Sequence, residues 1–123
     1  MTPVTTAPAP GFDATVVTVR GDLDLLNAAF LREAGVRLAE AHRWNLVVDL
    51  SGVPFIDSTG LGVLVGILKR VRAHDGRVAV AGCNAYVASA LRVTGLNRLL
   101  NPAPTVTDAL RGGFQPSRPE DPQ

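Results

Sequence analysis

Cysteine, aromatic residues and long apolar runs are all scarce in this sequence. Cys83 is the only cysteine among 123 residues, which excludes an intrachain disulfide and a metal site built from paired cysteines. No apolar run approaches the roughly 20 residues that span a bilayer, and no basic start followed by an apolar stretch opens the chain. We therefore expect a cytoplasmic protein that does not enter a membrane.

An excess of charge of either sign is also missing. The 12 basic and 11 acidic residues leave a formal net charge of +1, and the basic ones are dispersed except for Lys69, Arg70 and Arg72. The broad basic face that nucleic-acid binding usually requires is therefore absent. We expect no direct contact with nucleic acid.

The patterns of catalytic centres are absent as well. Ser58 does not lie in a Gly-x-Ser-x-Gly elbow, and His42 and His74 fall at predicted helix ends, away from any nucleophile. The glycines at 60, 62 and 66 lack the Lys-Ser/Thr pair that completes a phosphate-binding loop. Trp44, just before a predicted strand, fits the edge of a core better than a ligand site. We expect no enzymatic activity, no cofactor and no metal.

The composition is nevertheless sufficient for one packed domain. The chain is 46% hydrophobic and 19% charged, and its length is typical of a single domain. Prolines gather at both ends, with Pro3 and Pro8 near the start. We expect residues 1–11 to be flexible or to form a short edge strand, residues 12–111 to form the domain, and residues 112–123 to be a flexible tail.

Short β-branched or apolar runs alternate with helix-like stretches. The runs are Thr15–Arg20, Leu46–Leu50 and Arg77–Ala81, and each is followed by turn residues and then by an amphipathic segment. Crossovers of this β-α-β kind make neighbouring strands parallel. The predicted fold is therefore α/β and layered, with a largely parallel mixed sheet of four to five strands and about four helices.

Apolar spacing and capping residues set the predicted helix boundaries. The first helix should run from about residue 25 to residue 42, with one apolar face. A later helix, about 85–94, has Asn84 placed as its N-cap and Gly95 placed to end it in the left-handed conformation.

The last part of the domain is less regular. A short helix near 107–111 has Thr105 or Thr107 as its candidate N-cap. Residues 96–103 contain proline and should form a short strand or an irregular segment.

The segment 47–65 runs from a strand through a loop into a helix. In this helix the apolar residues cover an arc of roughly 200°, which is wider than one core-facing stripe requires. Val63 and Ile67 lie farthest from the centre of the arc, and Gly62 and Gly66 form a strip without side chains. One interpretation is an exposed docking surface. The other is that the glycines let this helix sit close to the sheet or to another helix.

Asp57, Ser58 and Thr59 stand where this helix begins. Asp and Ser are preferred caps because their oxygens accept hydrogen bonds from otherwise unpaired amides, so capping alone would explain them. Asp22 and Asp24 follow the first predicted strand, where turn formation and capping would explain them as well. Local chemistry by itself assigns these residues only a structural role.

Four blocks, taken in their order and spacing, resemble the STAS-domain family, specifically the bacterial anti-sigma factor antagonists. The resemblance extends from about residue 15 to residue 110. It departs from the family at the start, where antagonists commonly have an extra edge strand that the prolines here should make short or absent. The blocks are Gly21-Asp22-Leu23-Asp24, Val48-Asp49-Leu50-Ser51-Gly52-Val53, Ile56-Asp57-Ser58-Thr59-Gly60-Leu61-Gly62-Val63-Leu64 and Val93-Thr94-Gly95-Leu96.

The resemblance implies a partner-switching regulator. In that family the unphosphorylated antagonist binds an anti-sigma factor, which then releases the sigma factor that it was holding. The anti-sigma factor is usually an ATP-dependent serine kinase that phosphorylates the antagonist, and a serine phosphatase restores the active form. The acceptor serine corresponds to Ser58, with Thr59 as a minor candidate, and the ATP belongs to the partner. We expect a monomer or a weak dimer.

A phosphate at this position would change the local charge strongly. It adds roughly −1.5 to −2 charges, and a contact that buries Ser58 would then have to desolvate a dianion, so binding should be lost. The free amides at the helix start should accommodate the phosphate without unfolding. The predicted partner-binding residues are Asp22, Asp24, Asp57, Ser58, Thr59, Gly60, Gly62, Val63, Gly66 and Ile67.

A different use of the same fold is also open. The chain could serve as a STAS scaffold or adaptor subunit in a stress-sensing or transporter-associated assembly, because fold alone does not determine function.

Overall fold

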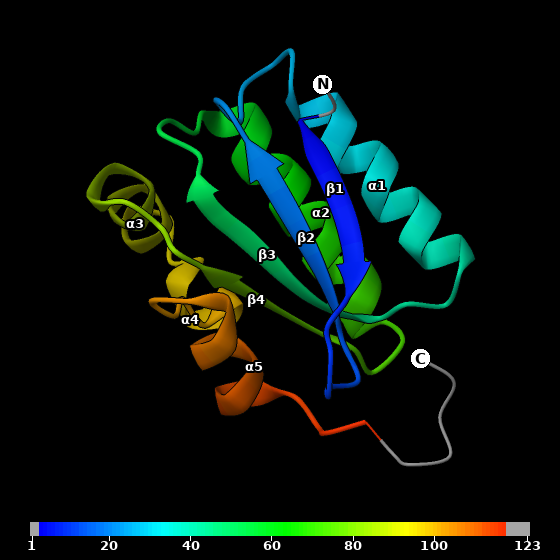
Figure 1. Ribbon diagram of the computed structural model, residues 1–123. Helices are drawn as coiled ribbons and strands as arrows, with labels where there is room; N and C mark the ends of the chain where they lie inside the picture. Colours follow the sequence, from blue (N-terminus) through cyan, green and yellow to red (C-terminus); the bar gives the residue numbers. More distant parts are fainter. Residues whose placement is uncertain (1–2, 118–123) are drawn as a thin grey trace.

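A four-stranded sheet with helices on both faces makes up the structure, a computed structural model that describes residues 3–117 (Figure 1). The strands are β1 (Val4–Pro8), β2 (Thr15–Arg20), β3 (Asn45–Gly52) and β4 (Arg77–Ala81). Their order in the sheet is β1-β2-β3-β4, with β1 antiparallel to β2 and the other neighbours parallel. The prediction of a largely parallel mixed sheet is therefore confirmed.

The helices are α1 (Ala28–Glu40), α2 (Ser58–Arg72), α3 (Ala85–Val93), α4 (Asn97–Leu100) and α5 (Val106–Gly113). The first four pack on one face of the sheet, and α5 packs on the other (Figure 1). One core cluster joins β2, β3 and β4 to α1, α2, α3 and α4, and a second joins β3 and β4 to α5. The described residues thus contain five helices, one more than the sequence predicts.

β3 is buried on both faces, which accounts for its continuous apolar run. Leu46, Val48 and Leu50 belong to the larger core cluster under α1 and α2, whereas Val47 faces the cluster beneath α5. Side chains of a strand alternate between the two faces, so only a central strand covered on both sides needs apolar residues at successive positions.

α1 begins three residues later than the sequence predicts. The carboxylate of Asp24 accepts hydrogen bonds from the amides of Leu26 and Asn27 at 3.1 and 3.0 Å, which holds this stretch in a turn. Leu25 and Leu26 are consequently 72% and 78% exposed in a loop and do not extend the apolar face of the helix.

Residues 96–103 contain a short helix, so the prediction of a strand or an irregular segment is wrong for its first half. α4 occupies Asn97–Leu100, and the amide of Leu100 donates to the carbonyl of Leu96 at 2.9 Å. Burial of the Leu100 side chain drives this turn, and Asn101 ends it at a positive φ of 44° before Pro102.

The predicted caps of the later helices are confirmed. Asn84 caps α3 by accepting a hydrogen bond from the amide of Val87 at 2.8 Å, and Gly95 follows the helix with a φ of +76°. Thr105, the first of two candidates, caps α5 by accepting from the amide of Asp108 at 3.1 Å.

Packed structure extends beyond residues 12–111 at both ends. β1 forms a five-residue edge strand within residues 1–11, and Pro8 stands at its end, where a missing amide matters least. After α5, Phe114 packs on the second core cluster, and Pro116 forms an isolated antiparallel β-bridge with Phe12. The tail predicted for 112–123 lies outside the described residues from 118 onward.

At Gly60, in the first turn of α2, the helix lies directly against Leu23 in the loop after β2. A Cβ built at Gly60 would collide with the carbonyl oxygen of Leu23 and lie 2.8 Å from its Cγ. Gly62, one half-turn on, faces open space with nothing within 4 Å.

Replacing Gly60 with Ala should lower the free energy of unfolding by at least about 2 kcal/mol, since the added methyl meets backbone that cannot move aside. Gly62→Ala is the matched control and should leave stability unchanged or raise it by about 0.5–1 kcal/mol through better helix propensity. Urea denaturation of both variants tests this difference. Equal stabilities would contradict the close approach at Gly60.

Candidate functional site

The loops that follow β2 and β3 lie side by side at the carboxyl edge of the sheet. The amide of Gly21 donates to the carbonyl of Gly52 at 2.9 Å, and the amide of Leu23 donates to the carbonyl of Phe55 at 2.8 Å. Leu23 and Ile56 also form a parallel bridge. Carboxyl ends of parallel strands meet at one edge, so residues distant in sequence converge there.

The loop after β4 joins the same edge. The side-chain amide of Asn84 donates to the carbonyl of Pro54 at 3.0 Å while its oxygen caps α3. The Phe55 and Tyr86 rings stack with centroids 5.3 Å apart. The loop before α2 is therefore held from two sides, by the loop after β2 and by the start of α3.

Asp57 is the N-cap of α2, and Ser58 is the first residue of the helix. One carboxylate oxygen of Asp57 accepts from the amides of Thr59 and Gly60 at 2.9 and 3.1 Å. The interpretation of Ser58 as the cap is therefore wrong, because the neighbouring carboxylate already fills that role. Ser58 is exposed, and its hydroxyl is not needed for capping.

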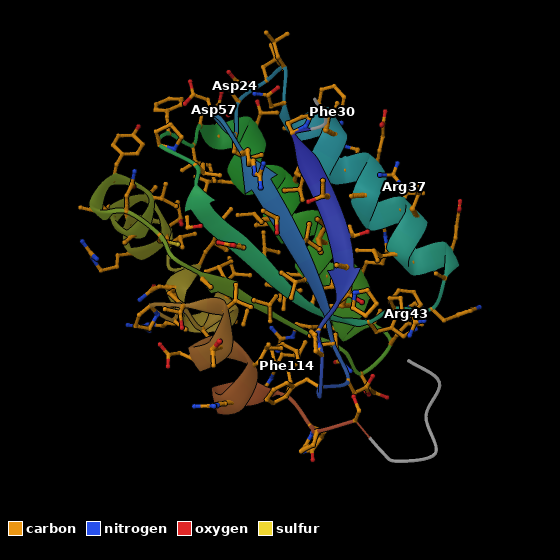
Figure 2. All side chains as sticks on the ribbon, viewed as in Figure 1. Asp24, Phe30, Arg37, Arg43, Asp57 and Phe114 are labelled. Carbon is orange, nitrogen blue, oxygen red and sulfur yellow. The ribbon has the colours of Figure 1, made fainter. Side chains whose placement is uncertain are left out.

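The aspartates of the loop after β2 have separate roles. The Asp24 carboxylate binds two backbone amides, as described for the start of α1. Asp22 is exposed, and its carbonyl accepts from the side-chain amide of Asn27 at 2.8 Å. Figure 2 shows Asp24 and Asp57 at the same end of the molecule, so this loop and the start of α2 share one surface.

A shallow groove of about 230 Å³ runs between α1 and α2 from this surface. Gly62 and Gly66 are exposed, and a Cβ at either position would meet nothing within 4 Å. Of the two interpretations of these glycines, open surface agrees with the structure and close packing does not. The groove is lined by Arg32, Ser58, Thr59, Gly62, Val63, Gly66, Ile67 and Arg70.

The prediction that Val63 and Ile67 are exposed is wrong. They are only 6% and 5% exposed and form the floor of the groove, because α1 packs over this side of α2. Gly35 of α1 permits that approach, since a Cβ there would lie 3.0 Å from Cγ1 of Ile67. Gly60 is also buried, against Leu23, so it positions the site without offering a surface to a partner.

Exposed apolar side chains near Ser58 come from positions that periodicity does not single out. Among residues 3–117, five of the eight exposed large apolar residues lie at this edge of the sheet, and we call them the apolar rim: Leu25, Leu26, Phe30, Phe55 and Tyr86. Figure 2 shows Phe30 at the same end as Asp24 and Asp57. One sequence signal for this surface is the pair Leu25-Leu26 directly after Asp24, a residue type that favours turns. The predicted first helix, which begins at about residue 25, wrongly includes both leucines.

The histidines lie at the opposite edge of the sheet. His74 stacks on Trp44 with ring centroids 3.8 Å apart, and His42 meets the same ring edge-on at 6.3 Å. The length of α2, about 22 Å for its 15 residues, separates them from Ser58. A depression of about 560 Å³, larger than the groove, is also at that edge and is remote from the loops described above.

Other reactive groups are isolated. Burial raises the pKa of the Cys83 thiol, which keeps it protonated and weakly nucleophilic. Within the described chain, no three His, Cys, Asp or Glu side chains gather as metal ligands do. None of the helices among residues 3–117 has the length and apolar content that crossing a bilayer requires.

Replacing Asp57 with Ala should lower the free energy of unfolding by about 1–2 kcal/mol, because two amides lose their acceptor. Asp57→Asn should retain most of the stability, since Asn caps equally well without charge. Urea denaturation measures both, and Asp22→Ala, at an exposed carboxylate, should change stability by less than about 0.5 kcal/mol. An equal loss for Asp57→Ala and Asp57→Asn would show that charge and not capping matters at this position.

Comparisons with known proteins agree with this architecture. A family model described as STAS domain matches residues 6–109. An anti-sigma-B factor antagonist of Bacillus subtilis is 34% identical over 99 residues, which cover 80% of this chain and 86% of that protein. One from Staphylococcus epidermidis is 32% identical over 85 residues, covering 69% and 79%. The crystal structure of an anti-sigma factor antagonist from Mycobacterium paratuberculosis has a TM-score of 0.79 at 28% identity, covering 89% of this chain and 91% of that one.

The family match includes β2 to β4, α1 to α4 and the whole candidate site. Two relatives above 30% identity extend over more than two thirds of both chains. This chain therefore belongs to the STAS-domain family.

Proposed function

We propose that this protein is an anti-sigma factor antagonist controlled by phosphorylation of Ser58. The unphosphorylated form binds an anti-sigma factor in the cytoplasm, where sigma factors act, and thereby frees a sigma factor. The relatives above 30% identity carry the name anti-sigma-B factor antagonist. The observation that carries the proposal is that Ser58 is exposed and stands at the first position of a helix capped by its neighbour Asp57.

The partner-binding surface we propose combines the loop edge with the groove. Asp22, Asp24, Asp57, Ser58 and Thr59 supply polar groups near the start of α2, and exposed Gly62 and Gly66 let a partner's backbone come close to the helix. Val63 and Ile67 form the floor of the groove. Gly60 is buried against Leu23 and contributes by positioning the start of α2. The apolar rim adds the desolvated contact area on which protein–protein affinity largely depends.

Phosphorylation switches off this surface by charge. A phosphoserine carries roughly −1.5 to −2 charges at neutral pH, and a partner covering it would have to remove the water around that charge. Ser58 is exposed, so the modification adds its charge without disturbing the packing beneath α2. The domain stays folded while the binding surface is lost.

The chemistry of the cycle belongs to the partners in this proposal. A serine kinase, the anti-sigma factor itself, supplies ATP and transfers the phosphate, and a serine phosphatase removes it. The chain is a substrate and not an enzyme, because His42 and His74 lie at the far edge from Ser58. It needs no cofactor or metal for binding, and a monomer or weak dimer presents the whole surface.

Replacing Ser58 with Ala should preserve binding to the anti-sigma factor kinase encoded in the same genome and abolish phosphorylation by it. Ser58→Asp should weaken binding by about 1–3 kcal/mol, the scale of an uncompensated buried polar group. Calorimetry with the purified kinase gives the affinities, and mass spectrometry after incubation with ATP locates the phosphate. Thr59→Ala is the matched control and should still be phosphorylated at Ser58.

Equal affinities for wild type, Ser58→Ala and Ser58→Asp would contradict the switch. A phosphate found on Thr59 in place of Ser58 would show that Thr59 is the acceptor and would contradict the assignment of Ser58. Stable self-assembly in size-exclusion chromatography, without any kinase, would favour the scaffold or adaptor alternative instead.

A further inference from the structure

Two of the amides at the start of α2 are already occupied. Asp57 accepts hydrogen bonds from the amides of Thr59 and Gly60, which are the donors that a phosphate at a helix start would otherwise use. The Asp57 carboxylate is also negative and would repel a phosphate on the adjacent Ser58. Asp57 would therefore compete with the phosphate for these donors, and a cation from another element would stabilise the dianion.

We infer that Arg32 of α1 is that cation, and that its guanidinium crosses the groove to bind the phosphate of phosphorylated Ser58. Arg32 and Ser58 line the same groove, from α1 and α2 respectively. Both side chains are exposed, so neither has to leave a packed position to make the contact. This inference rests on the proposal that Ser58 is the phosphate acceptor.

The helix geometry brings the two side chains within reach. α1 and α2 each connect parallel strands and so run in the same direction, and Gly35 packs against Ile67. Arg32 comes three residues before Gly35 and is thus about level with Leu64, roughly 9 Å along the groove from Ser58 at 1.5 Å per residue. Helical side chains lean toward the N-terminus, which is the direction of Ser58.

The chemistry favours Arg32 over the other cation in the groove. A guanidinium presents a planar pair of donors that matches two phosphate oxygens, and it stays charged at every relevant pH. Arg70 lies twelve residues after Ser58 on the same helix, about 18 Å away. It marks the far end of the groove and is out of range of the phosphate.

The contact would alter the binding surface in a second way. In the unphosphorylated protein, Arg32 is an exposed cation that lines the groove, where a carboxylate of the partner can reach it. After phosphorylation it is held by the protein's own phosphate. Modification then both adds negative charge at Ser58 and withdraws positive charge from the groove. Both changes lower the affinity for a partner whose contact is acidic.

The test uses phosphoserine placed at position 58 during translation, so that no kinase is required. Phosphorus NMR over a pH titration gives the second pKa of the phosphate, ordinarily near 6. In the wild-type background this pKa should be about 0.5 lower than in Arg32→Gln, because a nearby cation favours the dianion. Arg32→Lys should give an intermediate value, and Arg70→Gln, the matched control, should behave as wild type.

Equal phosphate pKa values in wild type and Arg32→Gln would overturn the inference, as would an equal effect of Arg70→Gln. Circular dichroism checks that each variant is folded, which the exposure of both arginines favours. The outcome is separate from the proposed function. Failure of the kinase to modify Ser58 would contradict the proposed function but would not change the pKa difference measured on the incorporated phosphoserine. Equal pKa values together with normal partner switching would remove only the role of Arg32.

Discussion

The backbone of Leu23 links the two loops that form the candidate site at the carboxyl edge of the sheet. Its amide donates to the carbonyl of Phe55, its carbonyl accepts from the amide of Asp57 at 3.3 Å, and its side chain is fully buried. These bonds extend the pairing of β2 and β3 into their loops, so Asp57, directly before α2, is held by Leu23, in the loop after β2. Gly60 completes the arrangement, since only a residue without a side chain lets the helix start lie against Leu23.

With the helix start fixed in this way, adjacent residues can take different roles. Asp57 satisfies the amides of α2 and is partly buried, whereas Ser58 contributes little to the fold and stands in solvent. A residue that is free of structural duty can be modified at little cost to stability. In the proposed switch, the capping residue and the phosphate acceptor are thus different residues, so each cycle can return the same folded domain.

Much of the fold could be predicted from sequence because its signals are local. The β-branched runs, the Asn84 and Thr105 caps and Gly95 each act within a few residues, and each appears in the structure as predicted. The α4 helix could not be predicted in this way, because it depends on burial of Leu100 against the rest of the core. Tertiary packing overrode a local signal dominated by proline.

The candidate site was predicted in position but not in its surface. The sequence blocks single out Ser58 and the neighbouring aspartates, and the loops that carry these residues do meet. The role of Ser58 as acceptor stays a prediction. Periodicity on α2 alone assigned exposure to Val63 and Ile67, because nothing local shows that Gly35 lets α1 cover them. The exposed apolar residues come instead from the loops, where packing in three dimensions decides what remains uncovered.

This shift of the apolar surface bears on how charge can control binding. If the contact lay mainly on Val63 and Ile67, a phosphate at Ser58 would sit at one end of it. The apolar rim is instead drawn from the loop after β2, the start of α1, the loop before α2 and the start of α3. In the proposed complex, a partner that covers this rim also covers Ser58. Charge repels most effectively where water is excluded, so one phosphate at this point can control the whole interface.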